Sequence, residues 1–141
     1  MQKNTILGLL AVVLLLLLYV WNSQNLREWY PRDPILDKLK RDCMPVAPDT
    51  IKNIRLYEGS RAYTLNKQKI YLCLRREDGS YYSYNTLVYV FLHELSHAIY
   101  KGDSSDHNPS YQALFTQILD KAQKQGIFDP NIPVEDMYCA V

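Results

Sequence analysis

Residues 85–100 read NTLVYVFLHELSHAIY, and the interpretation of the whole chain depends on this stretch. It contains the motif HExxH, in which His93 and His97 are four residues apart and Glu94 follows the first histidine. On an α-helix, residues at positions i and i+4 lie on the same face, about one turn apart. This spacing allows two imidazoles to bind one metal ion with a carboxylate beside it.

The flanking residues predict that the motif lies on a helix. No proline or glycine occurs between Leu87 and Tyr100. Asn85 or Thr86 is expected to cap the N-terminus, and Gly102 is expected to end the helix. Apolar residues recur at helical spacing and predict one buried stripe, made of Val88, Leu92, Leu95 and Ile99.

His107 is the candidate for a third metal ligand. Catalytic zinc usually has three protein ligands and one open position for water. The chain contains three histidines, and His107 follows His97 by ten residues, after a polar turn. Asn108 and Pro109 then form a good helix cap and first helical residue. We therefore expect His93, His97 and His107 to bind Zn²⁺ together.

Two segments of the chain carry a resemblance to known proteins. HELSHA at 93–98, followed by HNPSY at 107–111, resembles the core of the WLM and SprT-like minimal zinc metalloproteases. Residues 63–75 are similar to the strand that those domains place before the active-site helix. The resemblance covers residues 54–126, and it departs from the usual pattern at Asn108, where glycine is more common. It implies a zincin-like domain that hydrolyses a peptide or protein substrate with zinc.

The predicted fold class is α+β. We expect an antiparallel or mixed sheet of about three strands, the active-site helix and a C-terminal helix, behind an N-terminal transmembrane helix. Alternating apolar residues predict strands at 54–57, 61–65 and 70–74. The last helix is expected over 109–125. The strand at 70–74 is a candidate edge strand that could hold an extended peptide.

The N-terminal segment is apolar enough to cross a membrane. Between Lys3 and Arg27 there are 23 residues without charge, and as a helix they would reach about 35 Å, more than a hydrocarbon core of about 30 Å. A cleaved signal peptide is the alternative, but residues 19–24 offer no small-residue cleavage pattern. We therefore expect an uncleaved, single-pass anchor that contacts the membrane through residues 5–21.

The expected division of the chain has three parts. Residues 1–26 form the anchor with a short flank, residues 27–50 a juxtamembrane linker, and residues 51–141 the metalloprotease domain. The short N-terminus with Lys3 favours placing the domain across the membrane, whereas the basic residues after the span favour the cytosolic side. The sequence leaves both orientations open.

The three cysteines allow at most one internal disulfide. Cys43 and Cys139 are the favoured pair, because both lie in loop-like regions. Cys73 lies in a predicted strand and is expected to be a small buried apolar residue.

The expected function is that of a membrane-anchored zinc metallopeptidase. Zinc on three neutral imidazoles lowers the pKa of a bound water towards about 7, and Glu94 acts as the general base that takes its proton. A second electrophile often assists, and the candidates are Tyr100, Tyr111 and Tyr138.

Alternative functions have their own signatures. A zinc-stabilised, non-catalytic binding module tethered to a membrane would have a fourth protein ligand, such as Asp103, Asp106 or a cysteine. A hydrolase of non-peptide amides would share the same zinc chemistry. No nucleic-acid partner is expected, because the net charge is +1 and no basic stripe with interleaved aromatics is strong enough to argue for one. The DNA-repair role found in the resembling families is therefore not carried over.

Overall fold

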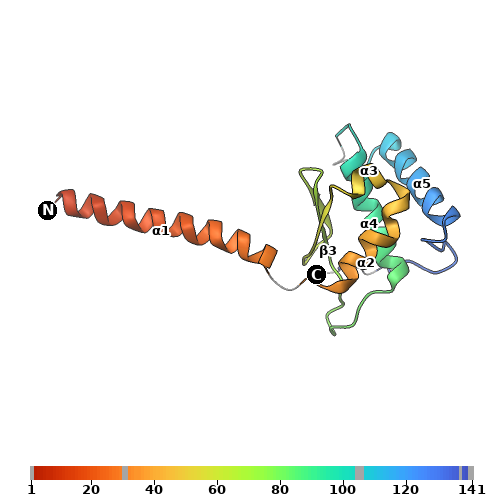
Figure 1. The fold of residues 1–141 in the computed structure, drawn as a ribbon, viewed down its shortest axis with the longest axis horizontal. Coiled ribbons are helices and arrows are strands. Elements are labelled where there is room, and N and C mark those ends of the chain that lie inside the picture. Colours follow the sequence, from red (N-terminus) through yellow and green to blue (C-terminus); the bar gives the residue numbers. More distant parts are fainter. Residues whose placement is uncertain (1, 30–31, 104–106, 137, 140–141) are drawn as a thin grey trace. The chain divides into compact units, whose positions relative to one another are not determined.

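The computed structural model describes residues 2–29, 32–103, 107–136 and 138–139 (Figure 1). The chain divides into two compact units, residues 1–31 and residues 32–141. Helix α1 (Gln2–Trp29) makes up the first unit.

Helix α1 contains an 18-residue window, Thr5–Asn22, that is long and apolar enough to cross a membrane. Its large apolar side chains between Ile6 and Trp21 are all at least 50% exposed. A signal sequence or the core helix of a soluble protein meets the same criteria of length and composition. The predicted N-terminal apolar helix is therefore present.

The second unit has the predicted α+β fold. Its elements follow in this order: α2 (Pro34–Cys43), the 3-10 helix η1 (Met44–Val46), α3 (Pro48–Ile51), β1 (Arg55–Glu58), β2 (Tyr63–Leu65), β3 (Lys69–Leu72), α4 (Tyr84–Ile99) and α5 (Pro109–Lys124). Strand β3 is central, with β1 parallel to it on one side and β2 antiparallel on the other. The sheet is therefore small and mixed, as predicted.

The expectation that residues 70–74 form an edge strand is wrong. β3 pairs with a neighbour on each side, so β1 and β2 are the edge strands. Strand order depends on pairing between distant segments, which alternation within one segment does not encode.

The helices of the second unit lie on one side of the sheet (Figure 1). Leu56, Ile70 and Leu72 face inward from the sheet and are fully buried. Helix α4 contacts β2 and β3, and α5 packs against α4. The motif helix therefore lies between the sheet and α5, in the centre of the unit.

Residues 34–50, which were expected to belong to a linker, lie within the second compact unit. Leu36, Leu39 and Val46 are at most 3% exposed. Leu36 and Leu39 lie on one face of the amphipathic helix α2, and Asp33 caps that helix by accepting a hydrogen bond from the Ile35 amide at 3.0 Å. This segment adds a helical layer to the core.

Ser83 caps helix α4, in place of the predicted Asn85 or Thr86. The helix begins at Tyr84, and the Ser83 hydroxyl oxygen accepts a hydrogen bond from the Thr86 amide at 3.2 Å. Asn85 is buried and instead binds the C-terminal tail, donating to the Asp129 carbonyl at 3.0 Å and accepting from its amide at 2.9 Å. The polar residues at the start of α4 therefore serve two different segments.

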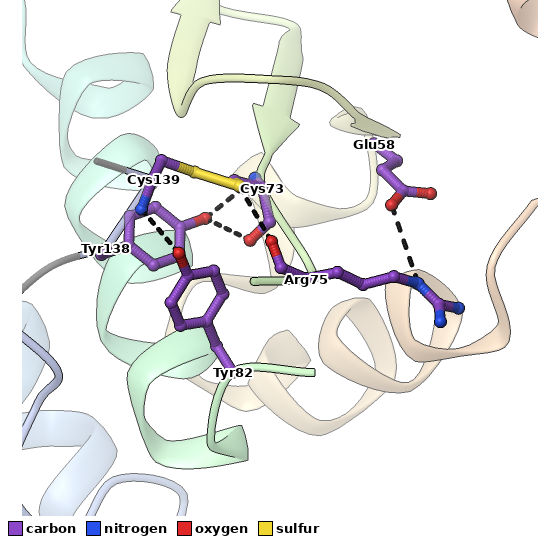
Figure 2. Close-up of a disulfide and its surroundings, with 6 residues drawn as sticks. All are labelled: Glu58, Cys73, Arg75, Tyr82, Tyr138 and Cys139. Carbon is purple, nitrogen blue, oxygen red and sulfur yellow. Dashed lines mark hydrogen bonds and ion pairs between the residues drawn. A yellow bond between two sulfur atoms is a disulfide. The ribbon is translucent and has the colours of Figure 1, made fainter. Parts of the chain in front are cut away.

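The cysteine pairing also differs from the prediction. Cys73 and Cys139 form a disulfide (Figure 2), whereas Cys43 is buried and free. The predicted pair of Cys43 and Cys139 is wrong because Cys43 faces the core from α2, where burial raises the pKa of its thiol to about 12. The Tyr138 hydroxyl holds the tail beside Cys73, donating to its carbonyl at 2.7 Å and accepting from its amide at 2.9 Å.

Candidate metal centre

Three imidazoles converge in the second unit. The Nε2 atom of His93 lies 3.2 Å from that of His97 and 3.1 Å from that of His107, and the remaining pair is 3.0 Å apart. His93 and His97 come from adjacent turns of α4, and His107 comes from the segment just before α5. Among the described residues, this cluster consists of the three histidines that the spacing singled out.

The three nitrogens fit a zinc ion. Zinc–nitrogen bonds of about 2.0–2.1 Å in a tetrahedral site place ligand nitrogens about 3.3 Å apart, close to the observed 3.0–3.2 Å. Burial, with contributions from His97 and His107, lowers the pKa of His93 to about 4. Burial also lowers the pKa of His97. The neutral imidazoles that metal binding requires are therefore favoured.

Tyr111 supports both histidines of α4. Its ring is fully buried and stacks on the His97 imidazole, with centroids 4.4 Å apart and planes 23° from parallel. Its hydroxyl donates to the His93 main-chain carbonyl at 2.9 Å. One side chain from α5 therefore packs against the part of α4 that carries the motif.

Asn108 holds the loop that carries His107. The backbone of His107 has a φ of 44°, in the left-handed region that non-glycine residues adopt infrequently. The next residue, Asn108, caps α5 by accepting from the Tyr111 amide at 3.0 Å, and the same oxygen accepts from the Tyr100 hydroxyl at 3.1 Å. This gives asparagine a physical role at the position where the resembling families usually have glycine.

Glu94 is nearly buried beside the histidines, with 6% of its surface exposed. Its Oε2 lies 2.8 Å from the Thr64 Oγ1, which is also 2.8 Å from the Glu94 main-chain carbonyl. Burial raises the pKa of the Glu94 carboxyl, and the Thr64 hydrogen bond opposes this rise. Sequence reasoning missed Thr64, although its place between the exposed Tyr63 and Leu65 marks it as inward-facing on β2.

A cleft of about 630 Å³ opens beside these groups. Ten residues line it: Ala62, Tyr63, Thr64, Asn66, Lys67, His93, Glu94, His97, Asp103 and His107. Sequence reasoning also missed Lys67, which lies in the turn after β2. Its ammonium donates to the Tyr100 carbonyl and, at 3.4 Å, to the His97 carbonyl, so a cation stabilises the C-terminal end of α4.

The three tyrosines proposed as second electrophiles belong to the framework. The Tyr111 hydroxyl donates to His93, the Tyr100 hydroxyl to Asn108, and the Tyr138 hydroxyl to Cys73. None of the three lines the cleft. Their role in the structure is to position the segments around the site.

The candidates for a fourth protein ligand are separated by the fold. Asp103 lines the cleft but is not part of the histidine cluster. Cys43 lies in the core, and Cys73 is paired with Cys139. Asp106 lies outside the described residues.

Comparison with known proteins identifies relatives of this region. A family model described as "WLM domain" matches residues 56–128, just over half of the 141-residue chain. The chain is 37% identical over 89 residues to "Uncharacterized protein 136R" of Invertebrate iridescent virus 6, covering 61% of this chain and 49% of that protein. It is 36% identical over 90 residues to "Uncharacterized protein 042R" of Invertebrate iridescent virus 3, and this match covers 63% of this chain and 55% of that protein. The chain thus spans about half the length of these curated relatives, and no solved structure matches it significantly.

Proposed function

The chain belongs to the WLM domain family, and from this premise we propose that it is a zinc-dependent metallopeptidase anchored in a membrane. The family is metallopeptidase-like, which agrees with the resemblance found in the sequence. The observation that carries the proposal is the convergence of three histidine Nε2 atoms in the cleft that Glu94 also lines. A metal site and a base therefore share one cavity.

The residues of the cleft divide the chemistry between them. Zinc on His93, His97 and His107 would supply a Lewis acid that activates water and polarises a carbonyl. Glu94 takes the proton of the attacking water and passes it to the leaving nitrogen. Its raised pKa suits this role, because a base is most effective when its pKa approaches the working pH. The Thr64 hydrogen bond keeps the carboxylate oriented.

The proposed substrate is an extended peptide that pairs with β2. This strand is an edge of the sheet, and its residues Tyr63 and Thr64 line the cleft. Peptides can bind an exposed strand edge through main-chain hydrogen bonds while alternate side chains enter pockets. Pairing with β2 would carry the peptide past the histidines.

Zinc content and peptide hydrolysis of the full-length chain in detergent micelles test this proposal. We expect one zinc per chain and hydrolysis of an unstructured peptide. Glu94→Gln should keep the zinc and lose at least about a hundredfold in kcat, because a positioned general base contributes about 10²–10⁴. His93→Ala should lose both. Glu77→Gln, an exposed glutamate outside the cleft, is the matched control. Full activity in Glu94→Gln would contradict the proposal.

The alternative is a zinc-stabilised, non-catalytic binding module. It is favoured by Asp103, a carboxylate in the wall of the same cleft. X-ray absorption spectroscopy of the zinc-loaded chain separates the two, because the module requires a protein oxygen as the fourth ligand. Replacing Asp103 with Asn would then weaken zinc binding strongly, whereas the peptidase proposal expects little change.

Helix α1 supports the membrane anchor, because 14 large apolar side chains between Ile6 and Trp21 are exposed and favour a non-aqueous environment. We expect the full-length chain to resist alkaline extraction from membranes. A variant with Leu14→Arg and Leu16→Arg should be extracted, since arginine at the centre of a span is costly. The intact mass of the membrane-bound chain excludes or reveals cleavage of a signal peptide.

A further inference from the structure

The segment that contains the three strands has an excess of basic residues, which acidic residues elsewhere in the second unit balance. Residues 52–75 contain six Lys or Arg residues and a single acidic residue, Glu58, which gives this segment a formal charge of +5. The second unit, residues 32–141, contains 14 basic and 14 acidic residues and is formally neutral. The remainder of the unit is therefore formally acidic. Two of the six cations pair with acidic residues outside the segment, Lys52 with Asp49 at 2.9 Å and Arg75 with Asp33 at 2.9 Å. Within the strands the positive charge is carried by Arg55 and Lys69.

The same segment builds a ladder of tyrosine rings across all three strands. Tyr57, Tyr71 and Tyr63 occupy one register row, in which the ring centroids are 5.1 Å and 4.5 Å apart and the planes are within 25° of parallel. The next row on the same face of the sheet, two residues along each strand, consists of Arg55, Lys69 and Leu65. We name these six residues the sheet face.

The sheet face points away from the core. Its members alternate along the strands with the buried Leu56, Ile70 and Leu72, and the helices lie on the side of those buried residues (Figure 1). Tyr63 is 41% exposed and Leu65 43% exposed. Cross-strand aromatic pairs stabilise a sheet, but sheet stability alone does not require cations in the neighbouring row.

We propose that the sheet face docks the second unit on an anionic membrane surface. This inference rests on the membrane anchor proposed for α1. Tyrosine rings favour the headgroup level of a bilayer, where an apolar body and a polar hydroxyl are both accommodated. Arg55 and Lys69, in the next row, match the negative charge of anionic lipids.

The covalent structure favours a membrane over a nucleic acid as the occupant. Eleven residues, 23–33, separate the apolar window from the start of α2, and this connection reaches at most about 40 Å even when fully extended. A unit tethered so closely meets the bilayer at high effective concentration, so weak surface affinity is sufficient. A stacking platform for single-stranded nucleic acid shares the aromatic and basic chemistry and is an outcome of the test.

Vesicle sedimentation of the second unit tests the proposal. Among the residues that the structure describes, the buried core residues all lie between Leu36 and Ala122, so residues 32–141 contain this core and can be produced without α1. The unit should bind vesicles of three parts phosphatidylcholine and one part phosphatidylserine, and should bind pure phosphatidylcholine far more weakly. Binding should fall as salt is raised. Because the second unit is formally neutral, its net charge gives no attraction to such vesicles. Binding would therefore reflect the local positive charge of the sheet face.

Charge-matched variants locate the binding surface. Arg55→Ser with Lys69→Ser should weaken binding to anionic vesicles about 25-fold, because each surface cation contributes about fivefold. Lys101→Ser with Lys124→Ser removes the same charge from exposed positions outside the sheet and should retain most of the binding. Arg55→Lys with Lys69→Arg keeps both charges and should also bind. Thermal melting verifies that each variant is folded.

Three results would overturn the docking proposal. These are equal binding to neutral and anionic vesicles, equal loss in the sheet-face and control variants, and binding of a 20-nucleotide poly-dT strand in place of vesicles. The unit lacks α1 and the readout is not hydrolysis. Failure here is therefore distinguishable from failure of the anchor, read by alkaline extraction, and from failure of the peptidase, read by Glu94→Gln.

Discussion

The Thr64 hydroxyl joins the edge strand β2 to Glu94, because its Oγ1 lies 2.8 Å from both the Oε2 and the main-chain carbonyl oxygen of that glutamate. A single hydroxyl proton serves one acceptor at a time, so the side chain and the backbone of Glu94 share one donor. This contact connects the strand proposed to bind substrate with the group proposed to act as base.

Replacement of Thr64 should impair hydrolysis without loss of zinc. Thr64→Val keeps the shape of the side chain and removes the donor, so we expect kcat to fall about ten- to a hundredfold, since a hydrogen bond to a charged group contributes about 1.5–3 kcal/mol. Thr64→Ser retains the hydroxyl and should restore most of the activity. The measurement is kcat and KM together with zinc content.

Thr116→Val is the control for this substitution. Thr116 is exposed on α5 and donates to the Gln112 carbonyl at 2.8 Å, so the same chemical change is made at a residue that does not line the cleft. Equal kcat values for Thr64→Val and Thr116→Val would contradict a positioning role for Thr64.

Two replacements of Asn108 should separate its contributions to stability and to zinc binding. Asn108→Ala removes the cap of α5 and should cost about 1 kcal/mol in the free energy of unfolding. Asn108→Gly should cost only a few tenths of a kcal/mol, because glycine is tolerated as a cap. Both variants lose the bond from the Tyr100 hydroxyl that steadies the loop carrying His107. We expect both to bind zinc about tenfold more weakly, as supporting residues around metal ligands typically contribute.

Urea unfolding of the metal-free chain and competition with a zinc chelator measure these two effects. Unchanged zinc affinity in Asn108→Gly would show that the Tyr100 contact does not hold His107 in place.

The parts of this fold that the sequence predicted are those encoded by local spacing. Helix α5 begins at Pro109 after its Asn108 cap, and α4 presents His93 and His97 one turn apart, because periodicity and capping act within a few residues. The parts that were missed depend on distant partners. Thr64 is 30 residues from Glu94 in the sequence, and the bonds to that glutamate exist only once β2 has paired with the central strand.

The C-terminal tail shows the same limit. The sequence predicts Asn85 as a cap of α4. In the structure its side-chain amide instead donates to the carbonyl of Asp129, a tail residue 44 positions further along the chain. Cys139 likewise pairs with Cys73 because the tail passes β3, while Cys43 is turned into the core by the amphipathic helix α2. Neither outcome follows from the local character of the residues involved.

The disulfide between Cys73 and Cys139 should contribute substantially to stability. It closes a loop with a sequence separation of 66 residues, for which the chain-entropy model gives up to about 4 kcal/mol. Cys139→Ser should lower the free energy of unfolding by up to about this 4 kcal/mol. Chain purified without reductant should show no reactive thiol when native, one after unfolding, and three after unfolding with reductant.

Cys43→Ala provides the control for the thiol count, because it should leave no thiol after unfolding without reductant. Detection of three thiols in the unfolded, unreduced wild-type chain would rule out the disulfide.

Acid should destabilise the metal-free chain through His93. The folded-state pKa of about 4 lies below the ordinary value of 6.5, so the unfolded chain takes up a proton that the folded chain resists. The stability contributed by this depressed pKa is present above about pH 6.5 and is lost as the pH falls towards 4. Glu94 acts in the opposite sense, because its raised pKa contributes stability at low pH that is lost as the pH rises through its folded value.

Urea unfolding of the metal-free chain between pH 4 and 7 measures this dependence. His93→Asn removes the titrating imidazole, so its stability should decline less steeply with acid than that of the wild type. Glu77→Gln, which replaces an exposed carboxylate, should follow the wild-type slope. Saturating zinc should steepen the decline in the wild type, since protons compete with the metal for the imidazoles. Identical slopes for His93→Asn and wild-type chain would mean that the burial of His93 does not govern acid stability.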